Sequence, residues 1–349
     1  MSCAERFGIH IGDVPRGAGN RITDVPGVRV GHATLGGEHR TGVTLIMPCP
    51  ENPFTHKLVA AAHVQNGFGK TAGLVQLAEL GTLETPIALT NTLSVGTVSD
   101  ALITYMLERC ARERIPIHSI NPVVGETNDA RFNRIADRAV KDVHVFQAIE
   151  SASVDFEEGD VGAGAGTVCH GLKGGIGSAS RLVEVAGHTY TLGILVQSNH
   201  GTLGELTIRG RRIGEEILAA RGEVPQEPLD RGSIMVILAT DLPLSDRQLA
   251  RVLRRTTVGL VRCGSYLGHG SGDVMIGFTT ENRVGNAGMD QILTRRVLSE
   301  HTLERVFYAA AEATEEAVIS SMLAARSGVA LDGRRVESLG EWLKQTESL

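Results

Sequence analysis

The stretch GEVPQEPLDRGSIMVILAT, residues 222–240, leads from a polar loop directly into an apolar strand. Residues 222–232 contain two prolines, three acidic side chains and no apolar periodicity, so they are expected to form an exposed loop. Residues 234–240 are almost entirely apolar, which is typical of a strand buried on both faces. The change of character falls at a single peptide bond, Gly232–Ser233.

Working outward from this strand, apolar runs bounded by turn residues alternate with helical patterns. Strands are predicted at residues 28–32, 43–47, 58–63, 87–90, 190–197, 234–240 and 274–279. Helices are predicted at residues 71–80, 98–112, 205–221, 245–262 and 303–326. This mixture places the chain in the layered α/β or α+β class.

Composition excludes several classes of protein. The chain has 349 residues and a net charge of −6, which argues against a nucleic-acid or membrane-surface partner. It has no run of about 18 apolar residues that could cross a membrane, and no apolar leader is expected at its start. Its five cysteines share no CxxC spacing, so neither a disulfide framework nor a zinc site is predicted. Free thiols favour a cytoplasmic protein.

The Gly232–Ser233 bond has the chemistry needed for self-cleavage. A serine hydroxyl can attack the carbonyl that precedes it, giving an ester that water hydrolyses, and glycine tolerates the strained backbone of that attack. The freed Ser233 would carry its hydroxyl beside an α-amine with an ordinary pKa of about 7.7–8.0, so the amine can serve as the base. A Gly-Ser pair alone more often marks only a turn, and the junction by itself leaves both interpretations open.

The 42 glycines are clustered, and several clusters lie in segments with a family resemblance. In order, these segments are RITDVPGVRVGH (21–32), NTLSVGT (91–97), PVVGETND (122–129), GAGAGTVCHGLKGGIGSASR (162–181), VQSNHG (196–201), RGSIMVILATDLPL (231–244) and GHGSGDVMIGFTTENR (268–283). Together they resemble the self-processing L-aminopeptidase/D-Ala-esterase-amidase family, which includes the β-peptidyl aminopeptidases. The resemblance runs from about residue 15 to about residue 325.

The resemblance implies a four-layer αββα sandwich, similar in layering to the N-terminal-nucleophile hydrolases but connected differently. It implies a single domain over residues 1–349 and self-cleavage before Ser233. The products would be a large fragment, residues 1–232, and a small fragment, residues 233–349, that stay associated. It also implies a homo-oligomer, such as a tetramer of cleaved heterodimers.

The resemblance assigns catalytic roles residue by residue. Ser233 matches the nucleophile. Ser271 and Asp273 in GSGD match a serine–acid pair that orients the nucleophile, although some relatives carry glutamate at the position of Asp273. A carboxylate joined to a second hydroxyl can steer protons near a nucleophile. Asn199 in VQSNHG matches an asparagine implicated in stabilising the oxyanion, a suitable role for a neutral amide donor.

Substrate binding is assigned to Glu126 and Asn128 in GETND. Glu126 is the candidate anion for the free amine of the substrate, and Asn128 stands near the position where some relatives have a tyrosine. The implied substrates are short peptides, amino-acid amides or esters, and the sequence leaves open the choice among L-, D- and β-amino acids. No metal or organic cofactor is expected, because the N-terminal amine activates the nucleophile.

Two alternatives remain open. A Ser-His-Asp hydrolase is suggested by TLSVG (92–96), one residue from a GxSxG elbow, with His200 and His269 in loop-like contexts. The other alternative is a non-catalytic oligomeric binding protein of the same fold, which would remain one intact chain.

Nucleotide and metal sites are not predicted from motifs. GFGKTAG (67–73) has Val64 where a phosphate-binding loop needs glycine, and GAGAGT (162–167) has Thr167 where a dinucleotide motif needs its third glycine. The 12 histidines include no HExxH motif and no closely spaced pair.

Overall fold

The computed structural model describes residues 3–224, 232–285 and 292–346. Its strands are β1 (Arg29–Leu35), β2 (Thr41–Met47), β3 (His56–Gly67), β4 (Thr82–Leu83), β5 (Ile87–Asn91), β6 (Val123–Thr127), β7 (Val168–Cys169), β8 (Leu172–Lys173), β9 (Ile176–Val185), β10 (His188–Asn199), β11 (Ser233–Thr240), β12 (Gly272–Gly285), β13 (Gly328–Val329) and β14 (Arg335–Val336). Its α-helices are α1 (Cys3–Arg6), α2 (Leu74–Leu80), α3 (Val95–Arg112), α4 (Asp142–Glu150), α5 (Ile213–Arg221), α6 (Asp246–Arg262), α7 (Leu303–Ala324) and α8 (Leu339–Thr346).

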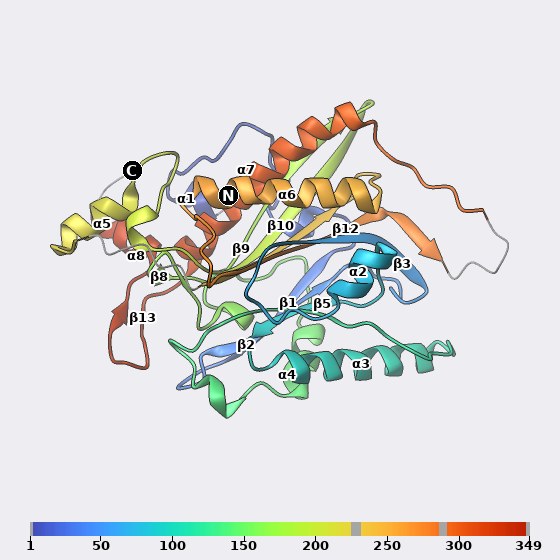
Figure 1. The fold of residues 1–349 in the computed structure, drawn as a ribbon, viewed down its shortest axis with the longest axis horizontal. Helices are drawn as coiled ribbons and strands as arrows, with labels where there is room; N and C mark the ends of the chain where they lie inside the picture. The colour runs from blue at the N-terminus through green and yellow to red at the C-terminus, as the bar shows by residue number, and fades with distance from the viewer. Residues whose placement is uncertain (1–2, 225–231, 286–291, 347–349) are drawn as a thin grey trace.

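Two sheets stack face to face between two layers of helices (Figure 1). The larger sheet has the strand order β4-β3-β12-β11-β10-β9, and the smaller has the order β1-β2-β5-β6. Helices α6 and α7 pack on the outer face of the larger sheet, and α3 and α4 pack on the smaller one. This arrangement is the four-layer αββα sandwich of the α/β class that the resemblance implies.

Three separate hydrophobic clusters fill the three gaps between the layers. Strand β11 lies between two of these clusters, and this position explains why its sequence is apolar throughout. Val236 and Leu238 belong to the cluster beneath α6 and α7. Met235 and Ile237 belong to the cluster between the two sheets. Since successive side chains of a strand point to opposite faces, a strand between two apolar layers needs apolar residues at every position.

Helix α7 lies close to the larger sheet because both surfaces carry small residues. Most of its residues are buried, and alanine recurs along it. A Cβ on Gly177 of β9 would lie 2.0 Å from the carbonyl oxygen of Ala317, so this glycine is required where strand and helix meet. Helix α6 is amphipathic and begins at a capping box, in which the Ser245 hydroxyl accepts from the Gln248 N–H.

All seven predicted strands are present, and the differences from prediction have local causes. β6 and β9 were missed because VVGET and IGSASR are interrupted by glycine and polar residues. The helix predicted at 205–221 begins only at Ile213, since Arg209 and Gly210 adopt positive φ angles of 53° and 77°. Residues 222–224 are exposed, as the loop prediction requires, whereas residues 225–231 lie outside the described residues.

The five cysteines are all buried and form no disulfide, as their spacing predicts. Among the described helices, none is both long and apolar enough to span a bilayer.

The burial of His32 on β1 can be tested through the pH dependence of the free energy of unfolding. Its ring lies between the Thr44 hydroxyl, 2.9 Å from Nδ1, and the Glu157 carbonyl oxygen, 3.1 Å from Nε2. Burial lowers the pKa of His32 from 6.5 to about 4. As the pH falls, the unfolded chain therefore binds a proton at His32 before the folded chain does. The free energy of unfolding consequently decreases by up to about 3 kcal/mol as the pH falls from 6.5 toward 4.

We expect His32→Gln to flatten the loss of unfolding free energy between pH 6.5 and pH 4. Denaturant unfolding of the variant and its parent, both carrying Ser233→Ala so that one unbroken chain unfolds, measures this slope. Parallel pH dependences for the two chains would show that His32 does not titrate as its burial requires.

Candidate active site

The strand order brings three of the resemblance segments to one end of the larger sheet. Ser233 is the first residue of β11, the central strand of a β10-β11-β12 group. It pairs with Asn199 on antiparallel β10 and with Gly272 on parallel β12. Residues far apart in sequence thus meet around Ser233.

The peptide bond before Ser233 has the contacts that self-cleavage needs. The Ser233 hydroxyl donates to the Gly232 carbonyl oxygen at 2.7 Å, so it lies against the group that it would attack. The Gly272 N–H is 3.2 Å from the same carbonyl oxygen and 3.3 Å from Ser233 Oγ. A backbone donor therefore already faces the oxygen on which negative charge would develop.

Gly232 is tightly enclosed. A Cβ at this position would lie 2.1 Å from the carbonyl oxygen of Asn199 and 2.4 Å from the Cα of His200. A side chain would push the Gly232–Ser233 bond away from β10, and this is a packing reason for glycine before Ser233.

Ser271 and Asp273 form the predicted pair. The Ser271 hydroxyl donates to Asp273 Oδ1 at 2.6 Å, and both residues are fully buried. Ser271 immediately precedes β12, Asp273 lies in this strand, and Gly272 stands between them. The hydrogen bonds of the Ser233 hydroxyl within the described residues go to Gly232 and Gly272 instead. Gly272 therefore stands between this pair and the Ser233 hydroxyl.

Asn66 on β3 was not predicted, yet it holds this region in place. Its side-chain amide donates to the carbonyl oxygens of Gly268, at 3.0 Å, His269, at 3.2 Å, and Ser271. Its partners are about 200 residues away in sequence, so nothing in the local pattern HVQNG indicates this role.

Asn199 lies at the end of β10 with its amide fixed. Its Oδ1 accepts from the Val168 N–H at 3.0 Å, and the residue is 8% exposed. A cavity of about 320 Å³ opens beside it, lined by Asn128, Arg131, Val168, Asn199, His200, Gly201 and Gly232. Asn128, which is exposed one residue beyond β6, and Gly232 thus face the same space. From the glycine segment 162–177, Val168 also lines this cavity.

Glu126 belongs to the smaller sheet and lies across from β12. Its carboxylate is buried and accepts from the Lys70 N–H at 2.8 Å and from the Thr92 hydroxyl. A Cβ on Gly69 would lie 3.4 Å from Glu126 Oε1 and 3.8 Å from the Cα of Gly272. The glycine therefore leaves open the space between the carboxylate and β12. A carboxylate can accept about four hydrogen bonds, so Glu126 retains capacity for an ammonium group.

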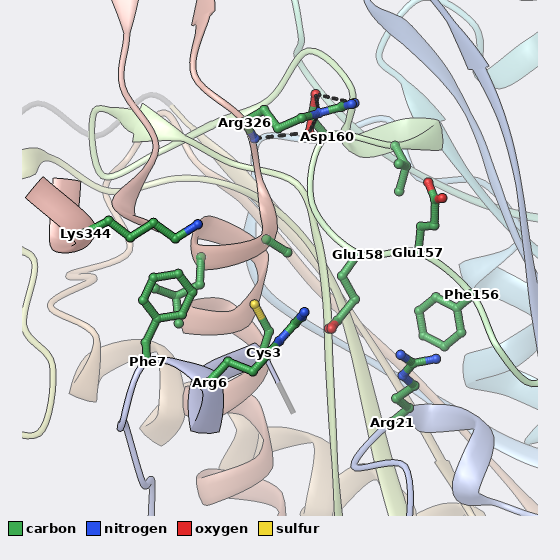
Figure 2. A pocket seen from close by; sticks show the side chains of 13 residues that line it. Cys3, Arg6, Phe7, Arg21, Phe156, Glu157, Glu158, Asp160, Arg326 and Lys344 are labelled. Atoms are coloured by element: carbon green, nitrogen blue, oxygen red, sulfur yellow. Dashed lines mark hydrogen bonds and ion pairs between the residues drawn. The ribbon is translucent and has the colours of Figure 1, made fainter. Parts of the chain in front are cut away.

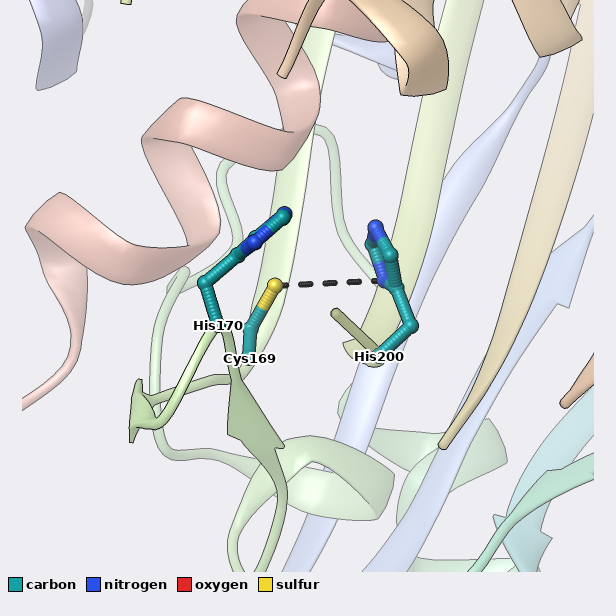
Figure 3. A group of neighbouring side chains, drawn as sticks. All are labelled: Cys169, His170 and His200. Carbon is teal, nitrogen blue, oxygen red and sulfur yellow. Dashed lines mark hydrogen bonds between the residues drawn. The ribbon is translucent and has the colours of Figure 1, made fainter. Parts of the chain in front are cut away.

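Cys169, His170 and His200 form a buried cluster, and His200 directly follows Asn199 in the chain (Figure 3). Their potential ligand atoms lie within 4.8 Å of one another, and Cys169 Sγ is 3.9 Å from His200 Nδ1. A thiol and two imidazoles are ligand types that zinc accepts, so these three side chains could hold a metal ion. Their separation in sequence hid the histidine pair from motif analysis.

The same cluster weakens the Ser-His-Asp alternative. Burial and the neighbouring His170 lower the pKa of His200 well below its ordinary value, so its imidazole is a poor base at neutral pH. Ser94, the elbow candidate, is buried at the N-cap of α3, and in the described part of the chain its hydroxyl bonds to no histidine. His269 is exposed.

A second cavity, of about 630 Å³, shares no residue with the one at Gly232 (Figure 2). Its walls carry both signs of charge, and Arg326 pairs with Asp160 at 3.1 Å. Its described lining residues include the Cys3 thiol, whose pKa burial raises to about 11. A thiol with so high a pKa is not a nucleophile at neutral pH.

Comparison with known proteins points to one group of hydrolases. The model of peptidase family S58 matches residues 20–336. Beta-peptidyl aminopeptidase BapA of Sphingosinicella microcystinivorans is 36% identical over 345 residues, covering 93% of this chain and 86% of that protein.

Solved structures agree with this match. The PH0078 protein of Pyrococcus horikoshii OT3 superposes with a TM-score of 0.91 at 45% identity, covering 99% of this chain and 98% of the other. The L-aminopeptidase D-Ala-esterase/amidase of Ochrobactrum anthropi, described as a prototype for the serine aminopeptidases and a variant of the Ntn hydrolase fold, gives a TM-score of 0.88 at 34% identity, with 99% and 98% coverage.

Proposed function

Since this chain belongs to peptidase family S58 and is an aminopeptidase, we propose that it becomes active by cutting its own Gly232–Ser233 bond. The observation that carries the proposal is the scissile carbonyl of Gly232, which receives the Ser233 hydroxyl at 2.7 Å and the Gly272 N–H at 3.2 Å. The nucleophile and an oxyanion donor thus converge on one peptide bond.

Self-cleavage proceeds by an acyl shift. Ser233 Oγ adds to the carbonyl carbon of Gly232 as its proton leaves, and the resulting oxyanion is held by the Gly272 N–H. When the C–N bond breaks, the proton passes to the Ser233 nitrogen, leaving an ester between Gly232 and Ser233 Oγ. Water hydrolyses this ester and leaves a carboxylate on Gly232 and a free amine and hydroxyl on Ser233.

The sheet explains why the two fragments, 1–232 and 233–349, would remain together. β11 and β12 belong to the small fragment, whereas β3 and β4 on one side and β9 and β10 on the other belong to the large one. The small fragment therefore lies inside the larger sheet, hydrogen-bonded on both edges. Separation would expose the apolar clusters on both faces of β11.

In the mature enzyme, Ser233 attacks the carbonyl of a substrate whose N-terminal residue occupies the cavity. Its own α-amine takes the hydroxyl proton, Asn199 stabilises the oxyanion, and Ser271 with Asp273 orients protons near the nucleophile. Glu126 does not line this cavity; its buried carboxylate receives the free amine of the substrate through the space beside Gly69, and Asn128 contacts the substrate from the cavity wall.

The substrates proposed are short peptides, amino-acid amides and esters with a free N-terminal amine. The support is the small cavity beside Gly232 and the names of the relatives, which are a beta-peptidyl aminopeptidase and an L-aminopeptidase D-Ala-esterase/amidase. Purified protein should release product from a panel of L-aminoacyl amides, D-alanyl esters and β-dipeptides. Failure on every member of the panel would contradict the proposal.

Glu126→Gln should raise KM by roughly 10- to 100-fold while kcat changes little, since a hydrogen bond to a charged group contributes about 1.5–3 kcal/mol. Steady-state kinetics on the best amide of the panel measure this. The matched control is the same substrate with its amine acetylated, which cannot use Glu126 and should be hydrolysed equally poorly by both proteins. An unchanged KM for the free-amine substrate would remove Glu126 from the amine site.

Assembly and location are part of the same proposal. We expect a homo-oligomer, such as a tetramer of cleaved heterodimers, and light scattering can test its mass. A cytoplasmic location suits five buried free thiols, and the acidic net charge of −6 suits neither nucleic acid nor an anionic membrane.

A further inference from the structure

Lys173, at the end of β8, is a buried cation whose hydrogen bonds all end on backbone carbonyls. The residue is 1% exposed, and its Nζ donates to Gly164 at 3.3 Å, to Thr167 at 3.0 Å and to Gly174 at 3.0 Å. An ammonium has three N–H donors, so these acceptors use the protonated group fully. Lysine is rarely buried, and this one has no place in the mechanism described above.

The peptide group between Thr167 and Val168 connects this ammonium to the active site. Its carbonyl oxygen accepts from Lys173 Nζ and from the Gly174 N–H, each at 3.0 Å. Its N–H, on Val168, donates to Asn199 Oδ1, also at 3.0 Å. A cation on the carbonyl oxygen polarises the peptide group, and the N–H of that group becomes a stronger donor.

The same contact determines which way the Asn199 amide points. Because the Val168 N–H requires an acceptor, Oδ1 faces it and Nδ2 must face the opposite side. Within the described residues Nδ2 has no acceptor of its own, and the side chain lines the cavity together with Gly232. Asn199 also pairs with Ser233 across the sheet. The Asn199 side chain therefore lines the same cavity as Gly232, with its N–H donors on the side away from the Val168 N–H.

We propose that Lys173 is a positioning residue of this active site: through the Thr167–Val168 peptide group, its ammonium orients the Asn199 amide and strengthens it as the oxyanion donor. This inference rests on the proposed function, because it gives Lys173 a role in the same site. It accounts for a buried charge in terms of a defined chain of two hydrogen bonds, from Lys173 to the Thr167 carbonyl oxygen and from the Val168 N–H to Asn199.

The surroundings of Lys173 balance its charge. Asp160 and Asp129 favour the ammonium, Arg40 and Arg326 oppose it, and the Phe132 ring lies 5.3 Å from Nζ. Burial lowers the pKa of Lys173 to about 7. Removing the charge therefore should not leave a large unbalanced field, and neutral variants are reasonable probes.

The test is a double-mutant cycle with two neutral variants. Lys173→Gln keeps a hydrogen-bond donor, and Lys173→Met replaces the side chain with an apolar one should the first variant fail to fold. Each is made in the wild-type chain and in Asn199→Ala, with Lys141→Gln, at an exposed lysine, as the control. Cell-free translation followed in time gives the self-cleavage rate, steady-state kinetics give kcat and KM, and melting temperatures report the fold.

We expect loss of the Lys173 charge to slow self-cleavage and kcat about 10-fold, a part of the 10²- to 10³-fold that loss of an oxyanion donor costs. KM should stay within about twofold, and in Asn199→Ala the same change should have an effect below about twofold, because a coupled pair does not add. A wild-type rate in a folded variant, or an equal loss in both backgrounds, would overturn the proposal.

Failure of the proposed function would look different. If the wild-type chain were never cut, the proposal of self-processing would be wrong. The double-mutant cycle of Lys173 and Asn199 would then still be measured through kcat of the aminopeptidase reaction. A rise in KM with unchanged kcat would show that Lys173 only shapes the cavity, and this too would overturn its assigned role.

Discussion

Ser233→Ala is expected to yield one unbroken chain of residues 1–349, with aminopeptidase activity reduced by more than about 10⁴-fold. The variant lacks the hydroxyl that lies 2.7 Å from the Gly232 carbonyl oxygen, so the acyl shift has no nucleophile. Without the cut, Ser233 also has no free amine to act as a base. Removal of the Ser233 hydroxyl oxygen is therefore expected to abolish both self-cleavage and substrate turnover. Denaturing electrophoresis and amide hydrolysis measure the two effects.

The matched control is Ser94→Ala, since Ser94 is the nucleophile of the Ser-His-Asp alternative. We expect this variant to be cut and to retain activity, because Ser94 is buried at the N-cap of α3. If Ser94→Ala were inactive while Ser233→Ala turned over substrate, the nucleophile would have been assigned to the wrong serine.

Asn199→Ala is expected to slow self-cleavage and kcat by about 10²- to 10³-fold, the usual cost of removing one oxyanion donor. The Gly272 N–H would remain on the scissile carbonyl, so cleavage should be slowed and not abolished. Time courses of the precursor and steady-state kinetics on the mature enzyme provide the rates.

Asn128→Ala is the comparison variant for Asn199, because it removes the same amide from the wall of the same cavity. Asn128 lies beyond β6 and is exposed, so its loss should alter KM by a few fold and leave self-cleavage unchanged. Equal slowing of self-cleavage by the two variants would contradict a specific oxyanion role for Asn199.

The fold was predictable where one residue type dominates an element. The run after Ser233 is apolar at every position because β11 separates two hydrophobic layers, and this pattern is visible in sequence. β9 was missed because its core-facing positions are filled by glycine, serine and alanine, which match the close approach of α7. Only the packed partner explains such residues.

Part of the candidate site was predictable from the sequence. The prediction came mainly from the resemblance to a known family and less from the chemistry of the individual residues. Ser233, Gly232 and Asn199 meet at one sheet end, and Ser271 bonds to Asp273 beside them, although the roles of these residues remain predictions. Asn66 and Lys173 were not predicted, because each acts on backbone groups that only folding brings close. The sequence specifies only the order of side chains, whereas the contacts of Asn66 and Lys173 depend on where backbone carbonyl oxygens lie in the folded chain.

The cut between Gly232 and Ser233 can be tested by the intact mass of freshly purified wild-type protein under denaturing conditions. We predict two species, residues 1–232 and residues 233–349, whose masses add to the full-length mass plus one water. A single species at the full 37.1 kDa after prolonged incubation would contradict the account.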